Sequence, residues 1–175
     1  MLTSRVRWPR PRSRNPLLRI ARWIWTLPTN LIGHLAGRLV SDAKPRRVGG
    51  PAAVAWLYPI RPGLPLKWFG AVTLGNAILY RAPILDSRDL RARLTLAHEL
   101  AHTRQSDWLG PLYLPLHGLA QAVSALISIG RPVVVSRLHD HNPLEQTFIC
   151  IAAAATRPPF PPGVDPERLL DAFAV

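Results

Sequence analysis

The longest regular pattern of apolar and polar positions runs from residue 88 to residue 108, a stretch without proline or glycine. Its apolar residues recur at the three- and four-residue spacing of a helix, so we predict a helix of about five to six turns. Asp86 or Ser87 is expected to cap it, with Asp89 in the first turn. Four residues should face the core: Leu90, Leu94, Ala97 and Ala101.

A shorter, β-prone pattern precedes this helix. A short strand is predicted over residues 53–57. A linker is predicted over residues 44–51, because this segment contains two prolines and two glycines. Two apolar runs, 67–74 and 77–82, flank the pair Gly75-Asn76. This arrangement predicts a β-hairpin, although one long strand bent at Gly75 would give the same pattern.

Two apolar segments follow the long helix. Residues 108–130 contain no Asp, Glu, Lys or Arg, and their length alone would permit a membrane span. Their prolines and polar residues instead favour a buried or membrane-dipping helix over about 116–129. A second helix is expected over 144–155, because Asn142 can cap it and Pro143 suits a first turn.

Charge is distributed unevenly along the chain. Residues 1–47 hold eleven of the 22 basic residues and one acid, Asp42, and so account for +10 of the net charge of +12. Trp23 and Trp25 lie in the same segment, a combination typical of an interfacial membrane anchor. The segment is therefore expected to attract an anionic membrane surface. Nucleic acid is disfavoured because no nucleic-acid fold signature accompanies the charge.

Composition limits the chemistry. Hydrophobic residues make up 48% of the 175 residues and charged residues 18%, enough to bury a core in one domain. The single cysteine, Cys150, excludes an intramolecular disulfide and any cluster of thiolates. A metal site in this chain would therefore use nitrogen and oxygen ligands.

The sequence His98-Glu99-Leu100-Ala101-His102 lies within the predicted helix. Residues four apart differ by about 40° around a helix axis, so both imidazoles can reach one ion. Zinc held by such ligands with one open position lowers the pKa of its water to about 7, and Glu99 can serve as the general base. The motif is expected by chance in roughly 0.3% of shuffled chains of this composition, which favours a zinc site over two surface histidines.

A third protein ligand must come from another part of the chain. Gln105 and Trp108 stand where a metzincin would need glycine and histidine, so that class is excluded. Glu145, early in the second predicted helix, would complete a two-histidine, one-glutamate set. His139 and His141 remain alternatives, as ligands or as donors to the reacting group.

Four blocks of sequence resemble small bacterial HExxH proteins of the gluzincin type. They are Thr73 to Tyr80, His98 to Gln105, Leu109 to Pro115, and Asn142 to Gln146. The resemblance covers about residues 70–150 and implies that Glu145 is the third zinc ligand and that a peptide lies along the strand before the helix, close to Gly75. Thr147 and Phe148 depart from the family pattern, which has an acid and a small residue there.

We therefore expect an α+β, zincin-like fold with a small sheet, the motif helix and a second helix carrying Glu145. Residues 1–48 are assigned to a basic, tryptophan-rich arm, 49–157 to the zincin-like domain and 158–175 to a proline-rich tail. The expected function is a zinc metallopeptidase, a hydrolase acting on a peptide or protein substrate, with Glu99 catalytic and His98, His102 and Glu145 binding Zn²⁺. The alternative is a non-catalytic zinc protein tethered by its arm to a membrane or larger assembly. Localisation is left open between the cytoplasm and the cytoplasmic face of a membrane.

Overall fold

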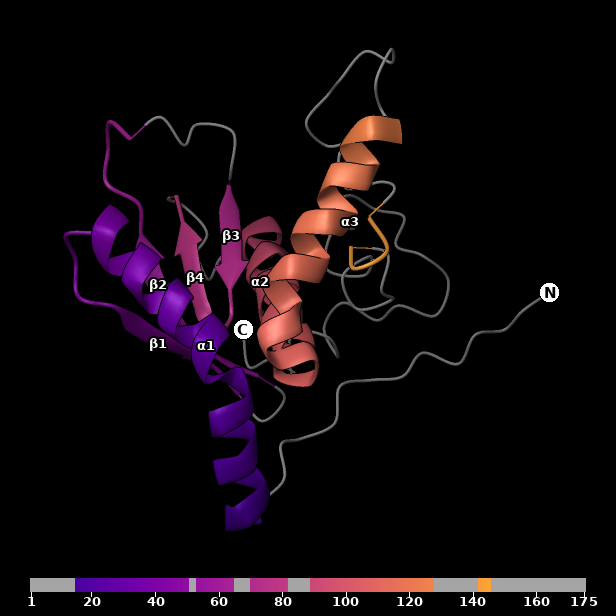
Figure 1. Cartoon of the computed structure of the whole chain (residues 1–175). Helices are drawn as coiled ribbons and strands as arrows, with labels where there is room; N and C mark the ends of the chain where they lie inside the picture. Colours follow the sequence, from indigo (N-terminus) through magenta and orange to yellow (C-terminus); the bar gives the residue numbers. More distant parts are fainter. Residues whose placement is uncertain (1–14, 51–52, 65–69, 82–88, 128–141, 146–175) are drawn as a thin grey trace.

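The computed structural model describes residues 15–50, 53–64, 70–81, 89–127 and 142–145. These residues form an α+β fold with a mixed four-stranded sheet and three α-helices among them (Figure 1). In chain order the elements are α1 (Pro16–Val40), β1 (Arg46–Gly49), β2 (Val54–Pro59), β3 (Ala71–Leu74), β4 (Ala77–Tyr80), α2 (Leu90–Leu109), the 3₁₀ helix η1 (Gly110–Leu112) and α3 (Tyr113–Ile127).

The sheet has the strand order β1-β2-β4-β3, and only the β2–β4 pair is parallel. Strands β3 and β4 form the predicted hairpin, with Leu74 opposite Ala77 and Gly75 at a φ of 65°. Strand β2 confirms the strand expected over 53–57. The linker expected over 44–51 is wrong, because Arg46–Gly49 pairs with β2 as strand β1.

Helices cover both faces of the sheet. Helix α1 lies on the face that carries Tyr58, Ala77 and Leu79, where Ala36 and Val40 pack against those side chains. The opposite face carries Thr73, whose hydroxyl bonds to Glu99 of α2. Because alternate residues of a strand point to opposite faces, the order of layers is α1, sheet, α2.

Small residues let α1 approach the sheet closely. Its buried residues are Thr26, Thr29, Gly33 and Gly37, which recur every three or four positions along one side of the helix. A Cβ at Gly33 would lie 2.0 Å from the carbonyl oxygen of Leu74, and one at Gly37 would lie 2.5 Å from the Tyr58 ring. Residues 16–48, assigned from sequence to the N-terminal arm, thus pack on and pair with the strands that follow them.

Helix α2 confirms the motif helix predicted over 88–108. Asp89 lies just before its first residue instead of in the first turn, and its carbonyl accepts from Arg93 N–H at 3.0 Å. Leu94, Ala97 and Ala101 are buried as expected. Leu90 was assigned wrongly to the core: it is 40% exposed, whereas Ala92 in the same turn is buried. Asp86 and Ser87 lie outside the described residues.

Helix α3 confirms a helix in the uncharged stretch 108–130 but begins at Tyr113, with Pro115 accommodated in its first turn. One side of α3 is not buried within the fold, since Leu119 and Leu126 are 63% and 65% exposed, and the membrane-dipping alternative stays a prediction. Within the described residues, no helix combines the length and hydropathy that a membrane crossing requires. Residues 143–145 form a turn, and the rest of the helix expected over 144–155 lies outside the described part of the chain.

Candidate metal centre

Two histidines of α2 form the base of the site. His98 and His102 are one helical turn apart, and their Nε2 atoms lie 3.1 Å from each other. The rings are perpendicular, with centroids separated by 4.6 Å. The helix therefore directs both Nε2 atoms toward one point, as the four-residue spacing in the sequence indicates.

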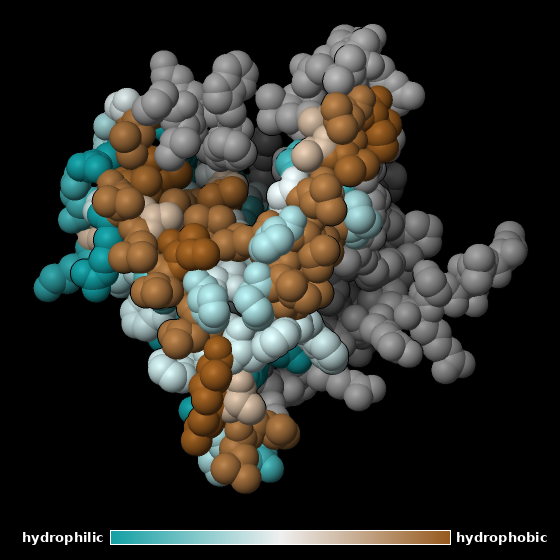
Figure 2. Space-filling model, in the orientation of Figure 1, coloured by the Kyte–Doolittle hydropathy of each residue, from teal (hydrophilic) through white to brown (hydrophobic). Residues whose placement is uncertain are grey.

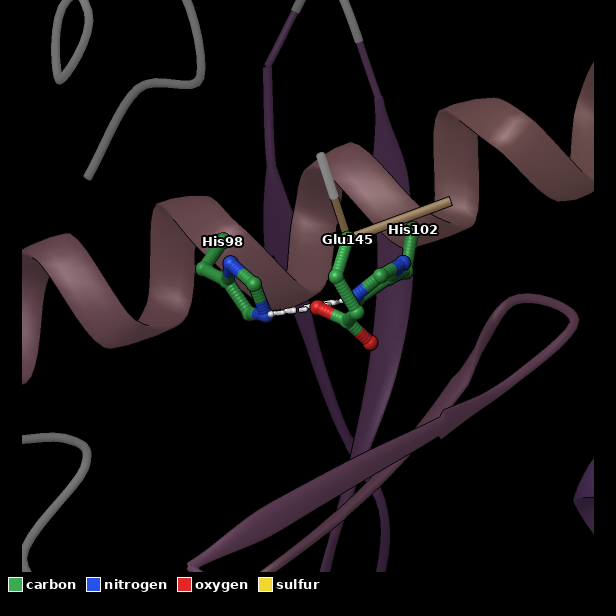
Figure 3. A group of neighbouring side chains, drawn as sticks. All are labelled: His98, His102 and Glu145. Atoms are coloured by element: carbon green, nitrogen blue, oxygen red, sulfur yellow. Dashed lines mark hydrogen bonds and ion pairs between the residues drawn. The ribbon is translucent and has the colours of Figure 1, made fainter. Parts of the chain in front are cut away.

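The turn at residues 142–145 brings a carboxylate to the same point. Glu145 Oε2 lies 3.2 Å from Nε2 of His98 and 3.2 Å from Nε2 of His102 (Figure 3). Asn142, fully buried, builds the turn: its side-chain oxygen accepts from Leu144 N–H at 2.9 Å, and its carbonyl accepts from Glu145 N–H at 3.0 Å. The Asn142 amide also donates to Gln121 of α3 at 3.1 Å, which fixes the turn against that helix.

The tautomer of His102 follows from its neighbour Gln105. The Gln105 amide nitrogen donates to the carbonyl oxygen of Leu144 at 2.6 Å, so its oxygen faces His102 Nδ1 at 2.8 Å. That oxygen can only accept, so Nδ1 carries a hydrogen, and in a neutral His102 the lone pair is then on Nε2. Gln105 thus leaves the Nε2 of His102 ready to bind a metal, as partners of metal-binding histidines commonly do.

The donor set fits a bound cation. The His102 lone pair and a carboxylate oxygen of Glu145 face each other at 3.2 Å, although the two side chains are only about 5% and 7% exposed. Two buried acceptors at this distance repel each other unless a proton or a cation lies between them. The three donor atoms are 3.1 to 3.2 Å apart. Three corners of a tetrahedron with bonds of about 2.0 Å are about 3.3 Å apart, so the spacing of these atoms suits a metal ion with bonds of that length. His98, His102 and Glu145 can therefore hold a metal ion.

The Glu99 carboxylate faces the sheet, where it contacts Thr73 of β3. Its carboxylate oxygen Oε2 accepts a hydrogen bond of 2.6 Å from Thr73 Oγ1, and its side chain is almost fully buried. Thr73 belongs to β3, the edge strand, so the helix and the sheet edge together orient this carboxylate.

His117 of α3 is a member of the site that the sequence analysis did not assign. Its Nε2 lies 3.3 Å from Glu145 Oε1, the carboxylate oxygen that does not face His98 and His102. Its ring stacks edge-on with His102 at 5.4 Å and is tilted against Tyr113 at 5.5 Å. His117 therefore contacts Glu145 through the carboxylate oxygen that is not directed at the two histidines of α2.

The structure brings together three of the residues that we assigned as ligands and places Glu99 beside Thr73. His139 and His141, the alternatives to Glu145, lie outside the described residues. Sequence reasoning missed His117, Gln105 and Thr73 as supporting residues. The only available signal was that Thr73 and Gln105 fall within the blocks that resemble the HExxH proteins.

Comparison with protein-family models, characterised proteins and solved structures yields no match. The site is therefore interpreted from its own geometry, as a candidate metal centre with two imidazole nitrogens and one carboxylate oxygen on an α+β fold.

Proposed function

We propose that this protein is a zinc-dependent metallopeptidase of zincin-like architecture. One observation supports the proposal above all: the donor atoms of His98, His102 and Glu145 lie within 4.8 Å of one another, and the two histidines are on the helix that also carries Glu99. Two imidazoles and one carboxylate are the ligands of thermolysin-type zinc sites, which leave one position open for chemistry. Zinc, when bound, would supply a Lewis acid that polarises a peptide carbonyl and acidifies water.

The roles of the side chains follow from their contacts. Glu99 is the proposed general base, which takes the proton of the attacking water and returns it to the leaving amine. Thr73 donates a hydrogen bond of 2.6 Å to the Glu99 carboxylate and so limits its rotation. A base that is already positioned loses less conformational freedom when the reaction begins.

The substrate is proposed to be an extended peptide segment. Strand β3 is at the edge of the sheet, and Thr73 on it contacts the proposed base. A peptide added as a further strand beside β3 would therefore run past Glu99. The role suggested for Gly75 needs correction: a Cβ there would lie 2.6 Å from Asn30 Oδ1, so its small size serves the packing of α1.

The deciding experiment separates metal binding from hydrolysis. In Glu99→Gln the three ligands remain, so bound zinc should stay near the wild-type level while peptide hydrolysis falls by about 10²-fold or more. In Glu145→Ala a ligand is lost, so zinc affinity and thermal stability should fall together. Zinc content is measured by elemental analysis, and hydrolysis by mass spectrometry of a casein digest.

Two results would contradict the assignment. Full zinc affinity in Glu145→Ala would remove Glu145 from the ligand set and direct attention to His139 and His141. No cleavage by the zinc-loaded wild type, with Glu99→Gln destabilised as strongly as Glu145→Ala, would favour a structural zinc site in a non-catalytic protein.

A further inference from the structure

Two exposed apolar surfaces lie on the same side of the molecule. Figure 2 shows hydrophobic side chains along α1 and along α3, on the face that both helices present to the viewer. Eleven large apolar side chains of α1 are at least 41% exposed. Leu17, Ile20, Ile24, Leu31 and Leu35 recur every three, four or seven residues, opposite the buried small residues of the same helix. Helix α1 therefore packs with its small side chains and leaves its apolar side exposed.

Helix α3 repeats this arrangement. Its exposed apolar residues Leu112, Leu116, Leu119, Val123 and Leu126, the first of them from η1, follow one another at intervals of four and three residues. The opposite side of the helix carries buried Tyr113 and Ser124, together with His117 of the metal centre. Apolar exposure on this scale is unusual on a soluble protein and marks an interaction surface.

These two rows of exposed apolar side chains, here called stripes, are joined into one surface where α1 crosses η1. Trp25 Nε1 donates to the carbonyl oxygen of Trp108 at 3.2 Å, and Thr29 Oγ1 donates to that of Gly110 at 2.7 Å. A Cβ at Gly110 would lie 2.3 Å from the Trp25 indole, so the ring is closely packed there. The tryptophans 23, 25 and 108 remain 45% to 74% exposed, which suits the headgroup region of a bilayer.

The charges on and next to these two helices favour an anionic partner. Helix α1 contains three arginines and no acid, and α3 contains no charged residue. The fourteen residues before Asn15 add five arginines and again no acid. No carboxylate on these helices would repel an anionic surface, and the arginines adjoin the apolar stripe, the pattern of a segment that binds acidic lipids.

We propose that the apolar surface of α1 and α3 docks into the headgroup and acyl boundary of an anionic bilayer, with both helices lying in the membrane plane. The proposal is independent of the peptidase assignment. The apolar surface and His117 lie on opposite sides of helix α3. The bilayer would therefore come within one helix diameter, roughly 10 Å, of the metal centre. Membrane-proximal segments would then be the polypeptides nearest to the site.

Flotation of the full-length protein with vesicles tests the proposal. The vesicles are phosphatidylcholine alone, or phosphatidylcholine with about one third phosphatidylglycerol. Wild type should float with the anionic vesicles, and the double variants Leu31→Glu/Leu35→Glu and Leu119→Glu/Val123→Glu should each lose more than about tenfold in affinity. Leu90→Glu is the matched control, because Leu90 is a 40% exposed leucine of α2 outside both stripes. Circular dichroism verifies that each variant folds.

Other occupants of the surface give different results. Binding by both double variants equal to that of Leu90→Glu would overturn the proposal. The proposal would also be overturned if the wild type does not bind vesicles, a result that is expected if residues 146–175 cover the surface. A lipid-free dimer that either double variant converts to a monomer, without vesicle binding by the wild type, would make the surface an interface between two copies.

Discussion

At the scale of single residues, Gln105 connects the metal centre to the rest of the fold. Its amide oxygen orients His102, and its amide nitrogen donates to the carbonyl of Leu144, next to Glu145. One side chain on α2 thus positions two of the proposed ligands. His117 acts on Glu145 from α3, so the three ligands are held by contacts from two helices.

Replacing Gln105 should therefore weaken metal binding without removing a ligand. In Gln105→Ala, His102 loses the acceptor for its Nδ1–H, and we expect zinc affinity to fall by about 10- to 100-fold. Gln105→Glu is the matched control, since it keeps an acceptor for Nδ1–H and should lose less. Competition with a chromogenic chelator measures both affinities. Wild-type affinity in Gln105→Ala would show that Gln105 does not orient His102.

At the scale of elements, α1 depends on glycine for its distance from the sheet. A methyl group at Gly33 would meet the backbone oxygen of Leu74, which cannot move without disturbing the β3–β4 hairpin. The contacts of α1 with β2, β3, β4 and η1 make it part of the folded structure, so a chain truncated before Gly50 would lose one layer of the fold. Point substitutions are therefore better tests of α1 than its removal.

Gly33→Ala should lower the free energy of unfolding by about 3 kcal/mol, because an overpacked contact outweighs the helix propensity that alanine gains. The control is Gly118→Ala in α3, where a Cβ would meet nothing within 4 Å. That change should raise stability by up to about 1 kcal/mol. Chemical denaturation compares the two variants. Equal stability of both would mean that α1 does not approach the sheet at Gly33.

At the scale of the whole molecule, the attachment of α1 to the sheet should depend on pH. His34 Nδ1 lies 2.7 Å from the Tyr58 hydroxyl, between α1 and β2. Burial, and then the nearby Arg38 guanidinium, lower the pKa of His34 below its usual 6.5, with Asn76 partly opposing them. Burial likewise raises the pKa of Tyr58, so its hydroxyl stays protonated and can donate to the histidine.

Stability should therefore fall as the solution becomes acidic. The unfolded chain binds a proton at His34 more readily than the folded chain does, so the contribution of neutral His34 is present above pH 6.5 and is lost as pH falls toward the lowered folded value. His34→Gln, which can still bond to Tyr58, should remove this component. Thermal unfolding of both zinc-loaded proteins from about pH 7.5 to about pH 5.5 measures it. Parallel curves for the two proteins would contradict the prediction.

The sequence alone determined those features that depend on residues close to one another along the chain. His98 and His102 share a side of α2 because helical periodicity acts over four residues, and Gly75-Asn76 joins two strands because a hairpin turn is equally local. The α+β class followed from these elements. Glu145 could be named from the sequence as the expected third ligand, ahead of His139 and His141, but how it reaches the two histidines depends on the turn at Asn142 and on α3.

Only the tertiary structure decided the contacts between distant residues. Thr73 and Glu99 are 26 positions apart, and Gln105 and Leu144 are 39 apart, so no local pattern reveals these pairs. The sequence likewise did not determine whether the apolar side of each helix faces the core or the surface. Periodicity shows that a helix has an apolar side, but not whether that side meets the core. In α1 the small residues give the closest approach to the sheet, so packing directs them inward and leaves the large apolar side chains exposed.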